Sequence, residues 1–405
     1  MKKKRSSKGL LTKKICKLRF VMGILRIVTR RVFIVLNIIT VILFLLACAN
    51  TFLHPGRWWM IALLGLIFPL LLLLLFLFFI IGIFLAGWRR WALVSLVALI
   101  IGWPNIHSFL ALHPWHSFRQ EKAPGALRIM TWNVRSFDEF TTRKKGASGH
   151  LPKMLQFIGG QHPDVLCIQE FFNSGVPMDS CSIPYIQERL RFPYYFFSRD
   201  YVNRGAKYDA GVIIFSRYPI VDTMVMAYSR PGGFHATESL ISADIHVGKD
   251  TIRVFTTHLQ SVLFHGQDFH NLEIIKNVDD SILMASKSIA KKLGYAFRHR
   301  GDQAEEVRAQ LDKSPYPAII CGDFNDVPNS YTYFTIRKDW QDAFLLKGFG
   351  IGRTYVHISP TLRIDYILAS STFDVLQCRK FSTPWSDHNP VVADFEVHPL
   401  APYGP

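Results

Sequence analysis

Acidic residues are almost missing from the first third of the chain. Residues 1–124 contain one acidic residue, Glu121, and 17 of the 47 Lys and Arg residues, whereas residues 125–405 contain the other 29 acidic and 30 basic residues. The formal net charge of +17 therefore divides into +16 (17 − 1) and +1 (30 − 29). A strongly basic protein commonly binds nucleic acid, but here the excess charge lies outside the part that is expected to be globular. Charge alone therefore does not indicate a nucleic-acid partner.

The chain also has few cysteines, six in 405 residues, and no Cys-x-x-Cys pair of the kind that binds a metal. Cys167 and Cys321 fall inside apolar, strand-like runs, where a free thiol packs as a small core residue. Cys181 and Cys378 form a candidate disulfide pair, which spacing alone does not decide. Cysteine usage thus neither supports nor excludes a site outside the cytoplasm.

Charge is absent from three long apolar runs, at about 32–53, 58–86 and 91–112. About 20 helical residues cross a ~30 Å hydrocarbon layer, so each run is long enough for a transmembrane helix. Residues 32–112 are therefore expected to be an all-α transmembrane region of about three helices, preceded by a basic cytoplasmic N-terminus, residues 1–31. Trp103-Pro104-Asn105 interrupts the third run, so whether this run spans completely stays open.

The positions of the cations predict the orientation in the membrane. Twelve Lys and Arg residues precede Val32, and Arg89 and Arg90 lie between the second and third runs. Short loops rich in Lys and Arg stay in the cytoplasm, so an odd number of spans places everything after about residue 113 outside. We expect a multi-pass protein of the plasma (inner) membrane with an extracytoplasmic domain. A cleaved signal peptide fits poorly, because its basic region would exceed thirty residues.

The rest of the chain is expected to form one α/β domain, residues 126–397, between a linker at 113–125 and a tail at 398–405. Short apolar runs rich in β-branched residues predict strands of a buried sheet. A long stretch at 271–311 has helical periodicity and many helix formers. The expected strands are at 127–132, 165–168, 211–215, 252–256, 318–320, 364–368 and 391–395.

Polar residues of a few types lie at or just beyond the ends of these strands, with Asp365 inside its strand. A lone Asp in such a place is usually a turn residue or a helix cap, but repeated placements of carboxylate, amide and imidazole groups are harder to attribute to turns. Side chains at strand ends converge on one edge of a sheet, where α/β folds place their sites. The candidate site residues are Asn133, Glu170, His258, Asp323, Asn325, Asp365, Asp387 and His388.

Short motifs around these residues carry a family resemblance. In order and spacing, the segments resemble the motif series of the endonuclease/exonuclease/phosphatase superfamily, the deoxyribonuclease-I-like fold, over roughly residues 126–397. The resemblance implies a four-layer sandwich of two mixed β-sheets flanked by helices. The motifs are TWNV at 131–134, DVLCIQE at 164–170, THL at 257–259, GDFN at 322–325, RIDYI at 363–367 and SDHNP at 386–390.

Phosphate-ester cleavage indicates a divalent cation at this site. The reaction requires up to ~20 kcal/mol of barrier lowering, and one general acid or base contributes only about 10² to 10⁴-fold. A cation neutralises the phosphoryl oxygens and stabilises the leaving alkoxide. Hard oxygen ligands favour Mg²⁺, with Mn²⁺ as a substitute. We expect Glu170 to be the first ligand, assisted by Asn133 and Asp387.

The family resemblance implies roles for the other residues. Asp323 would orient and deprotonate the attacking water, while Asn325 and His258 donate hydrogen bonds to the scissile phosphate. His388 would polarise a phosphate oxygen, with Asp365 fixing its tautomer, a pairing that also makes physical sense by itself. Tyr208 and Asp209 lie where the family often has substrate-facing groups and are candidate substrate contacts.

The main functional hypothesis is a membrane-anchored, Mg²⁺-dependent hydrolase of phosphodiester bonds, with nuclease activity first. Sphingomyelinase-like phospholipid hydrolysis and inositol-phosphate phosphatase activity are alternatives, because the motif residues bind only phosphate and metal. A catalytically inactive receptor or scaffold is a further alternative, disfavoured because no motif position is replaced. The expected partners are the phosphate-ester substrate and the lipid bilayer, and no protein partner is inferred. The Arg298-His299-Arg300 cluster is more typical of a solvated helix end than of a phosphate patch. The stretch 261–280 is expected to form a lid or to lie against the membrane, and its His265, Asp268 and His270 are expected to lie in a surface loop rather than to bind a metal.

Overall fold

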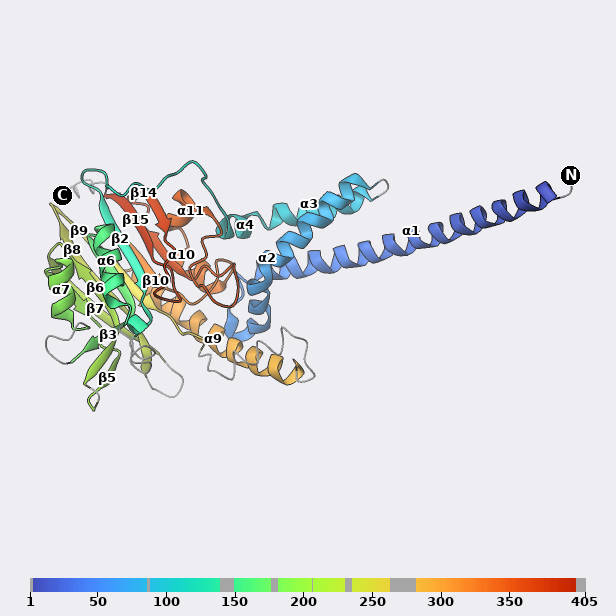
Figure 1. Ribbon diagram of the computed structural model, residues 1–405. Coiled ribbons are helices and arrows are strands. Elements are labelled where there is room, and N and C mark those ends of the chain that lie inside the picture. The colour runs from blue at the N-terminus through green and yellow to red at the C-terminus, as the bar shows by residue number, and fades with distance from the viewer. Residues whose placement is uncertain are drawn as a thin grey trace. The chain divides into compact units, whose positions relative to one another are not determined.

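The computed structural model describes residues 3–85, 88–138, 149–175, 181–205, 207–229, 235–262 and 282–397 (Figure 1). The chain forms two compact units. The first contains residues 1–48 and 67–104, and the second contains residues 49–66 and 105–405. The expected tail at 398–405 and residues 263–280 of the 261–280 stretch, with His265, Asp268 and His270, lie outside the described residues.

The first unit is helical. Two helices are long and apolar enough to cross a membrane, Lys17–Ala49 within α1 and the whole of α2, and the bent pair α3 and α4 makes a third if it is one span. The expected third run is thus divided by a 64° bend after Ile101, where Pro104 lacks a backbone N–H group for a continuous helix. The helices in this part of the chain are α1 (Lys3–Ala49), α2 (Pro55–Phe84), α3 (Arg89–Ile101) and α4 (Trp103–Phe109). Residues 55–66 of α2 and 105–109 of α4 belong to the second unit.

Polar and aromatic contacts join the helices of this first unit. The Ser95 hydroxyl donates to Asn37 Oδ1 at 2.9 Å, and the Asn37 amide donates to the Trp91 carbonyl at 3.1 Å. Both Asn37 and Ser95 are fully buried. Phe33 packs on Trp88, with ring centroids 4.5 Å apart. Buried polar pairs of this kind hold helices together in surroundings where the hydrophobic effect between helices is weak.

The second unit contains two large mixed sheets. The seven-stranded sheet has the order β14-β15-β2-β3-β6-β4, with β5 on β6, and the six-stranded sheet has the order β11-β13-β10-β9-β8-β7. The pairs β2–β3 and β9–β10 are parallel and the other pairs within these sheets are antiparallel. The first sheet comprises β2 (Leu127–Asn133), β3 (Val165–Ser174), β4 (Tyr194–Phe197), β5 (Tyr201–Asn203), β6 (Tyr208–Ser216), β14 (Phe373–Lys380) and β15 (Val391–Val397). The second comprises β7 (Ile220–Ser229), β8 (His235–Val247), β9 (Asp250–His258), β10 (Ala318–Asp323), β11 (Gln341–Asp342) and β13 (Asp365–Ala369).

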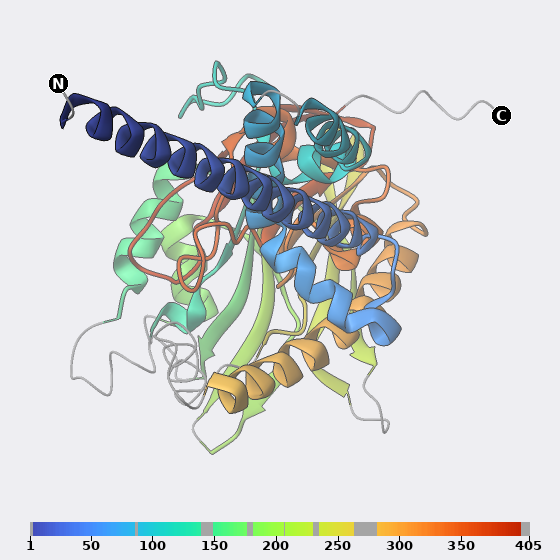
Figure 2. The same ribbon diagram turned by 90° about the vertical axis from the view of Figure 1, so that its right-hand side faces the viewer.

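The two sheets pack face to face through alternate residues of their strands, such as Ile129 of β2, Cys167 of β3 and Ile319 of β10. The outer face of the first sheet packs on α6 (Leu151–Gln161) and α7 (Ile183–Leu190). The outer face of the second packs on α9 (Ile282–Leu311) and α10 (Tyr331–Arg337). Figure 2 shows α6 and α7, in green, and α9, in orange, on different sides of the strands. The expected four-layer α/β sandwich is confirmed.

All seven predicted strands are present, but other strands were missed. Strand β8 carries buried polar residues, including Ser242 and Asp244, so it has no apolar run. Its Asp244 is paired with Arg253 of β9 at 2.5 Å. Edge strand β7 has one largely exposed face, so polar residues interrupt its apolar ones, and β4 is only four residues long. The predicted helix over 271–311 is present as α9 within the described residues.

Cys181 and Cys378 do not form the disulfide that was considered. Neither residue is disulfide-bonded, and both side chains are buried. Cys181 lies in the core beneath α6 and α7, whereas Cys378 lies in the core between the two sheets.

Segments next to the apolar helices belong to the second unit and bind its core. The amide of Asn50 donates to the Asn329 carbonyl at 2.9 Å, and the amide of Asn105 donates to Asn329 Oδ1. Asn329 itself is 1% exposed. Arg363 donates to the Ser108 carbonyl at 2.7 Å. Residues that follow α1 and residues of α4 thus meet at the same loop of the domain.

The segment expected to be a linker, 113–125, is also held against the domain. It is preceded by β1 (Ala111–Leu112), which pairs with β12 (Phe349–Gly350). The buried guanidinium of Arg128 donates to the Gln120 carbonyl at 2.7 Å and to both oxygens of Asp394, at 2.6 and 2.8 Å. Lys122 forms an ion pair with Asp164. These contacts hold the segment to the first sheet.

Replacing Asn329 by Leu is expected to destabilise the protein, because the buried amide of Asn105 loses its acceptor. An unsatisfied buried donor costs about 1–3 kcal/mol, which corresponds to a fall of about 2–12 °C in Tm for a domain of this size. Thermal unfolding of the full chain in detergent measures the effect.

The matched control is the double variant Asn105→Leu/Asn329→Leu, which removes donor and acceptor together and should recover part of the loss. A single variant with the wild-type Tm would contradict a structural role for this hydrogen bond.

Candidate active site

Strand register brings the candidate residues together at one edge of each sheet. Asp323, the last residue of β10, lies opposite His258 on the parallel neighbour β9 and opposite Asp365 on the antiparallel neighbour β13. In the other sheet, Asn133 ends β2 opposite Gln169 of β3, and Glu170 follows directly. The Asn133 amide joins the two sheets, because it donates to Asp323 Oδ2 at 3.0 Å.

Glu170 has an unusual backbone conformation. Its φ is +50°, and it lies where the β3–β6 register shifts between Ile168 and Phe171. A non-glycine residue in the left-handed region carries strain, and a bulge redirects a side chain out of the regular alternation. The Glu170 side chain is 39% exposed and accepts a hydrogen bond from the Asn133 amide at 3.0 Å. The bulge therefore presents a carboxylate at the sheet edge.

Asn133 is almost fully buried and hydrogen-bonded on both sides of its amide. Its nitrogen donates to Glu170 and Asp323, and its Oδ1 accepts from the Arg135 backbone N–H at 3.0 Å. In this arrangement Asn133 positions two carboxylates. Its predicted part in binding a metal stays a prediction.

Asp323 is buried in the centre of the cluster. The Asn325 backbone N–H donates to Asp323 Oδ1 at 2.8 Å. Burial raises the pKa of this carboxyl group and Asp365 adds to the rise, while His388, His258 and the Asn133 hydrogen bond oppose it. A carboxylate with a raised pKa is suited to accepting a proton.

Glycine is required immediately before Asp323. Gly322 has φ +140°, and a Cβ atom there would lie 2.1 Å from the Thr257 carbonyl oxygen. Only glycine fits such a close approach between β10 and β9. This explains the glycine of the GDFN segment.

His388 and Asp365 form the expected pair. His388 Nδ1 lies 3.0 and 3.2 Å from the two Asp365 oxygens, and its Nε2 lies 3.7 Å from Asp323 Oδ2. The Trp132 indole donates to the His388 carbonyl at 2.8 Å. Burial lowers the pKa of His388, but the charges of Asp365 and Asp323 outweigh it and raise this pKa to about 10.

His258 directs its ring toward the same carboxylates. Its Nε2 lies 3.7 Å from Asp323 Oδ2 and 3.9 Å from Glu170 Oε1, and this buried nitrogen has no hydrogen-bond partner in the described part of the chain. An unsatisfied buried donor is costly, so its position is suited to an incoming polar group. Asp200 interacts electrostatically with His258 and was missed by the sequence analysis, and burial raises its pKa to about 6.

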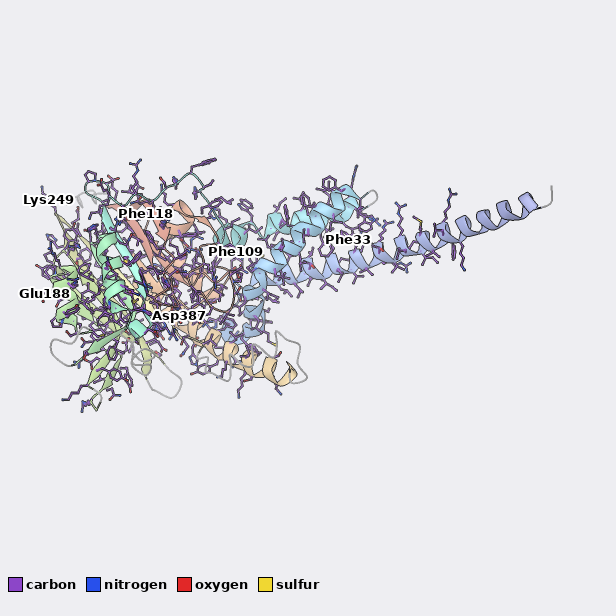
Figure 3. All side chains as sticks on the ribbon, viewed as in Figure 1. Phe33, Phe109, Phe118, Glu188, Lys249 and Asp387 are labelled. Carbon is purple, nitrogen blue, oxygen red and sulfur yellow. The ribbon has the colours of Figure 1, made fainter. Side chains whose placement is uncertain are left out.

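Asn325 and Asp387 complete the group. Asn325 has φ +53° and its amide donates to the Leu259 carbonyl at 2.9 Å, which fixes it beside the end of β9. Asp387, labelled in Figure 3, lies 3.6 Å from the Arg135 guanidinium and its side chain is 18% exposed. Its neighbour Ser386 donates to the Asn133 carbonyl at 2.8 Å.

Arg135 and Tyr355 are two site neighbours that the sequence analysis missed. Tyr355 packs on His388, with ring centroids 5.0 Å apart. Burial raises the Tyr355 pKa to about 12, and the nearby charges of Asp387, Asp323 and Glu170 contribute to the rise. Tyr355 lies in a coil segment without a motif, and Arg135 looked like an ordinary surface cation, so neither carried a sequence signal.

Tyr208 and Asp209 lie farther along the sheet. Ser174 pairs with Tyr208 and Asn173 with Asp209, three to four positions beyond Glu170, or about 10–13 Å at the usual strand rise. Asp209 is paired with Arg199 at 3.0 Å. Their contact with substrate remains a prediction.

Arg300 is neither a solvated helix end nor a phosphate-binding residue in the free protein. It is 1% exposed, and it bonds the Gln260 carbonyl at 2.9 Å and Asp326 at 3.3 Å. The sequence expectation for this part of the basic cluster was wrong, because the chain folds a carboxylate and a carbonyl onto it.

The donor set fits a hard divalent cation. The exposed carboxylate of Glu170 and the carboxylate of Asp387 are oxygen ligands of the type that Mg²⁺ and Mn²⁺ prefer. Asp323, Asp365 and His388 also have ligand atoms within 4.8 Å of one another. However, Asp365 already holds His388 Nδ1 with both of its oxygens, so we favour Glu170 as the residue open to a metal.

Solved structures from several organisms are similar to this chain. They include an endonuclease/exonuclease/phosphatase from Beutenbergia cavernae (21% identity, 67% of this chain, 72% of that chain, TM-score 0.45). The human Nocturnin catalytic domain is similar at 18% identity, over 68% of this chain and 95% of that chain, with a TM-score of 0.47. The Bacteroides thetaiotaomicron mannosyl-6-phosphatase is similar at 17% identity, over 66% of this chain and 99% of that chain, with a TM-score of 0.46. No curated protein matches the chain significantly.

Two family profiles match the sequence. Residues 30–109 match a domain of unknown function (DUF8431). Residues 130–388 match the Endonuclease/Exonuclease/phosphatase family, a range that contains every candidate site residue. Members of this superfamily are phosphoester hydrolases that generally depend on a divalent metal. With the four-layer fold and the converged carboxylate, amide and imidazole groups, this match means that the chain belongs to the endonuclease/exonuclease/phosphatase family.

Proposed function

We propose that this protein is a membrane-anchored, metal-dependent hydrolase of phosphodiester bonds, with nuclease activity as the first candidate. The observation that carries the proposal is the Asn133 amide, which bridges Glu170 of one sheet and Asp323 of the other. It places a ligand-type carboxylate beside a buried carboxylate that is flanked by His258 and His388.

Asp323 is the proposed acceptor of the proton from the attacking water. Its two oxygens are held by the Asn325 backbone and the Asn133 amide, so the carboxylate cannot turn away. The raised pKa of Asp323 means that its carboxylate binds a proton more tightly than an ordinary Asp does, as a general base requires.

His388, His258 and Asn325 are the proposed phosphate-binding groups. The raised pKa of His388 keeps its imidazole protonated at neutral pH, so Nε2 can donate to a negatively charged phosphate oxygen. Such preorganised donors stabilise charge that develops in the transition state. A divalent cation held by Glu170 and Asp387 would supply charge neutralisation on the phosphoryl oxygens and the leaving alkoxide.

Nucleic acid is the first proposed substrate, and the charge of the catalytic domain limits how it binds. With 30 basic and 29 acidic residues after position 124, the domain offers few cationic contacts beyond the scissile phosphate. Phospholipid or inositol-phosphate hydrolysis is the second candidate. The observation in its favour is that residues 49–66, next to the apolar helices, belong to the same compact unit as the site.

We further propose that residues 32–112 anchor the protein in the plasma (inner) membrane and that the catalytic domain, residues 126–397, lies outside the cytoplasm. Asn50 follows α1 and Asn105 follows α3, and both bind Asn329. If α1 and α2 cross the membrane, the chain must cross again between the end of α2 and Asn105 to return to this loop. Three crossings and a basic N-terminus place the domain outside.

Glu170→Gln, Asp323→Asn and His388→Ala are each expected to lower kcat by about 10²-fold or more, because each removes one essential group. Chelation of divalent metal should abolish turnover. Steady-state hydrolysis by the full chain in detergent, with Mg²⁺ or Mn²⁺ added back, provides the measurement.

Matched controls are Glu188→Gln on α7 and Asp339→Asn, two exposed carboxylates outside the site, which should leave kcat unchanged. A folded site variant with near-normal turnover would remove that residue from the proposed mechanism. Complete inactivity of the wild-type protein on every phosphoester would favour the scaffold alternative.

Side-by-side assays of plasmid DNA, RNA, sphingomyelin and inositol phosphates decide the substrate class. The expected result is cleavage of nucleic acid. A plot of the logarithm of the binding constant against the logarithm of the salt concentration should have a slope shallower than about −4, because few phosphates are neutralised. Cleavage of the lipid or inositol substrates without nicking of plasmid or RNA would overturn the nuclease proposal and leave the metal-dependent site intact.

Alkaline phosphatase fused after Pro405 should be active in a bacterial host, because that enzyme folds only outside the cytoplasm, and a fluorescent protein fused there should be dark. The opposite pattern would mean that α3 and α4 do not return the chain across the membrane.

A further inference from the structure

The first half of α9 presents a cationic stripe to solvent. Lys287, Lys291, Tyr295 and Arg298 are all exposed, and Tyr295 is 53% exposed. Their spacing of four, four and three residues places them on one face of a helix. The buried residues Ile289, Ala296 and Phe297 are on the other side, so the stripe faces away from the core.

The part of α9 that carries the stripe contains no compensating acid. Residues 282–301 contain five basic residues and no Asp or Glu. Arg300 is excluded from the stripe because it is buried against Asp326. Acidic residues of α9 begin at Asp302, so the charge changes sign in the middle of the helix.

This part of α9 is fixed beside the first turns of α2. A Cβ atom on Gly294 would lie 2.6 Å from the Trp59 ring, and one on Gly301 would lie 2.7 Å from Pro55. The Arg298 guanidinium lies 5.7 Å from the Trp59 ring centroid. The two glycines, seven residues apart, let α9 approach the start of α2.

The start of α2 and the turn before it expose large apolar side chains. Phe52 is 81% exposed, Trp58 is 51% exposed and Met60 is 67% exposed. Phe52 precedes α2, and Trp58 and Met60 lie in its first two turns, at the N-terminal end of a helix that is long and apolar enough to cross a membrane. Aromatic residues are enriched at the boundary between hydrocarbon and headgroups, and adjacent Lys and Arg side chains bind phosphate headgroups there.

We propose that the stripe of Lys287, Lys291, Tyr295 and Arg298 binds anionic phospholipid headgroups at the surface of the bilayer that holds α1 and α2. The inference rests on the membrane anchoring proposed above and is independent of the substrate. Cations and an exposed aromatic ring on one helical face, next to exposed apolar residues, match the charge and polarity of an anionic lipid surface.

Nitroxide labels on the full chain in nanodiscs test this proposal. Labels at Tyr295→Cys on the stripe and Lys153→Cys on α6, over the other sheet, are compared in discs that contain a nickel-chelating lipid. Nickel at the lipid surface should enhance the spin relaxation of the nitroxide at position 295 several-fold more than that of the nitroxide at position 153. This difference should grow when phosphatidylglycerol rises from zero to about a third of the lipid.

In the triple variant Lys287→Gln/Lys291→Gln/Arg298→Gln, the difference in relaxation between the two labels should no longer depend on phosphatidylglycerol. In the charge-conserving variant Lys287→Arg/Lys291→Arg, this dependence should remain. Equal relaxation at Tyr295 and Lys153 would overturn the lipid-binding stripe. A label at Leu73 of α2, which is 55% exposed, separates the causes of failure. If Tyr295 and Lys153 relax equally while the Leu73 label is in lipid, the lipid-binding stripe is wrong and the anchoring stands. If the Leu73 label is in water, the proposed anchoring is wrong as well.

Discussion

The register of β10 is the constraint on which the site depends. Asp323 can meet His258 and Asp365 together only because the ends of β9, β10 and β13 are level, with one parallel and one antiparallel neighbour. A slip of one residue would turn Asp323 to the opposite face of the sheet. Gly322 maintains the close approach to Thr257, and the alternating core residues Ile319 and Cys321 fix the register over the length of the strand. The core and the site are therefore determined by the same pairing.

Much of this arrangement could be predicted from the sequence, because buried central strands leave apolar runs and their polar end residues stand out. The predicted strands at 127–132 and 318–320 are present as β2 and β10. The missed strands β7 and β8 have polar or alternating residues whose burial depends on partners far away in sequence. The buried role of Arg300 was missed for the same reason, because Asp326 and Gln260 reach it only after folding. The functions of the site residues stay predictions, since geometry shows proximity and not turnover.

The loop after the GDFN segment connects the site with the segments next to the apolar helices. Asn325 lies at the site, and Asn329, four residues later, binds Asn50 and Asn105. Between them, Asp326 accepts from Arg300 and Thr332. Buried polar networks of this kind specify one arrangement, because each unpaired member is costly. The anchor-proximal segments are thus part of the folded domain that carries the site.

The left-handed conformation of Glu170 has a consequence for how the protein can change over time. A glycine at this position would adopt φ +50° without steric penalty, whereas a residue with a Cβ pays about 1–2 kcal/mol. Replacement of Glu170 by glycine would therefore relieve this strain but would remove the carboxylate that accepts a hydrogen bond from the Asn133 amide. Directed evolution of a more heat-resistant protein, screened by expression without an activity assay, should show whether the backbone strain or the hydrogen bond contributes more to stability at this position.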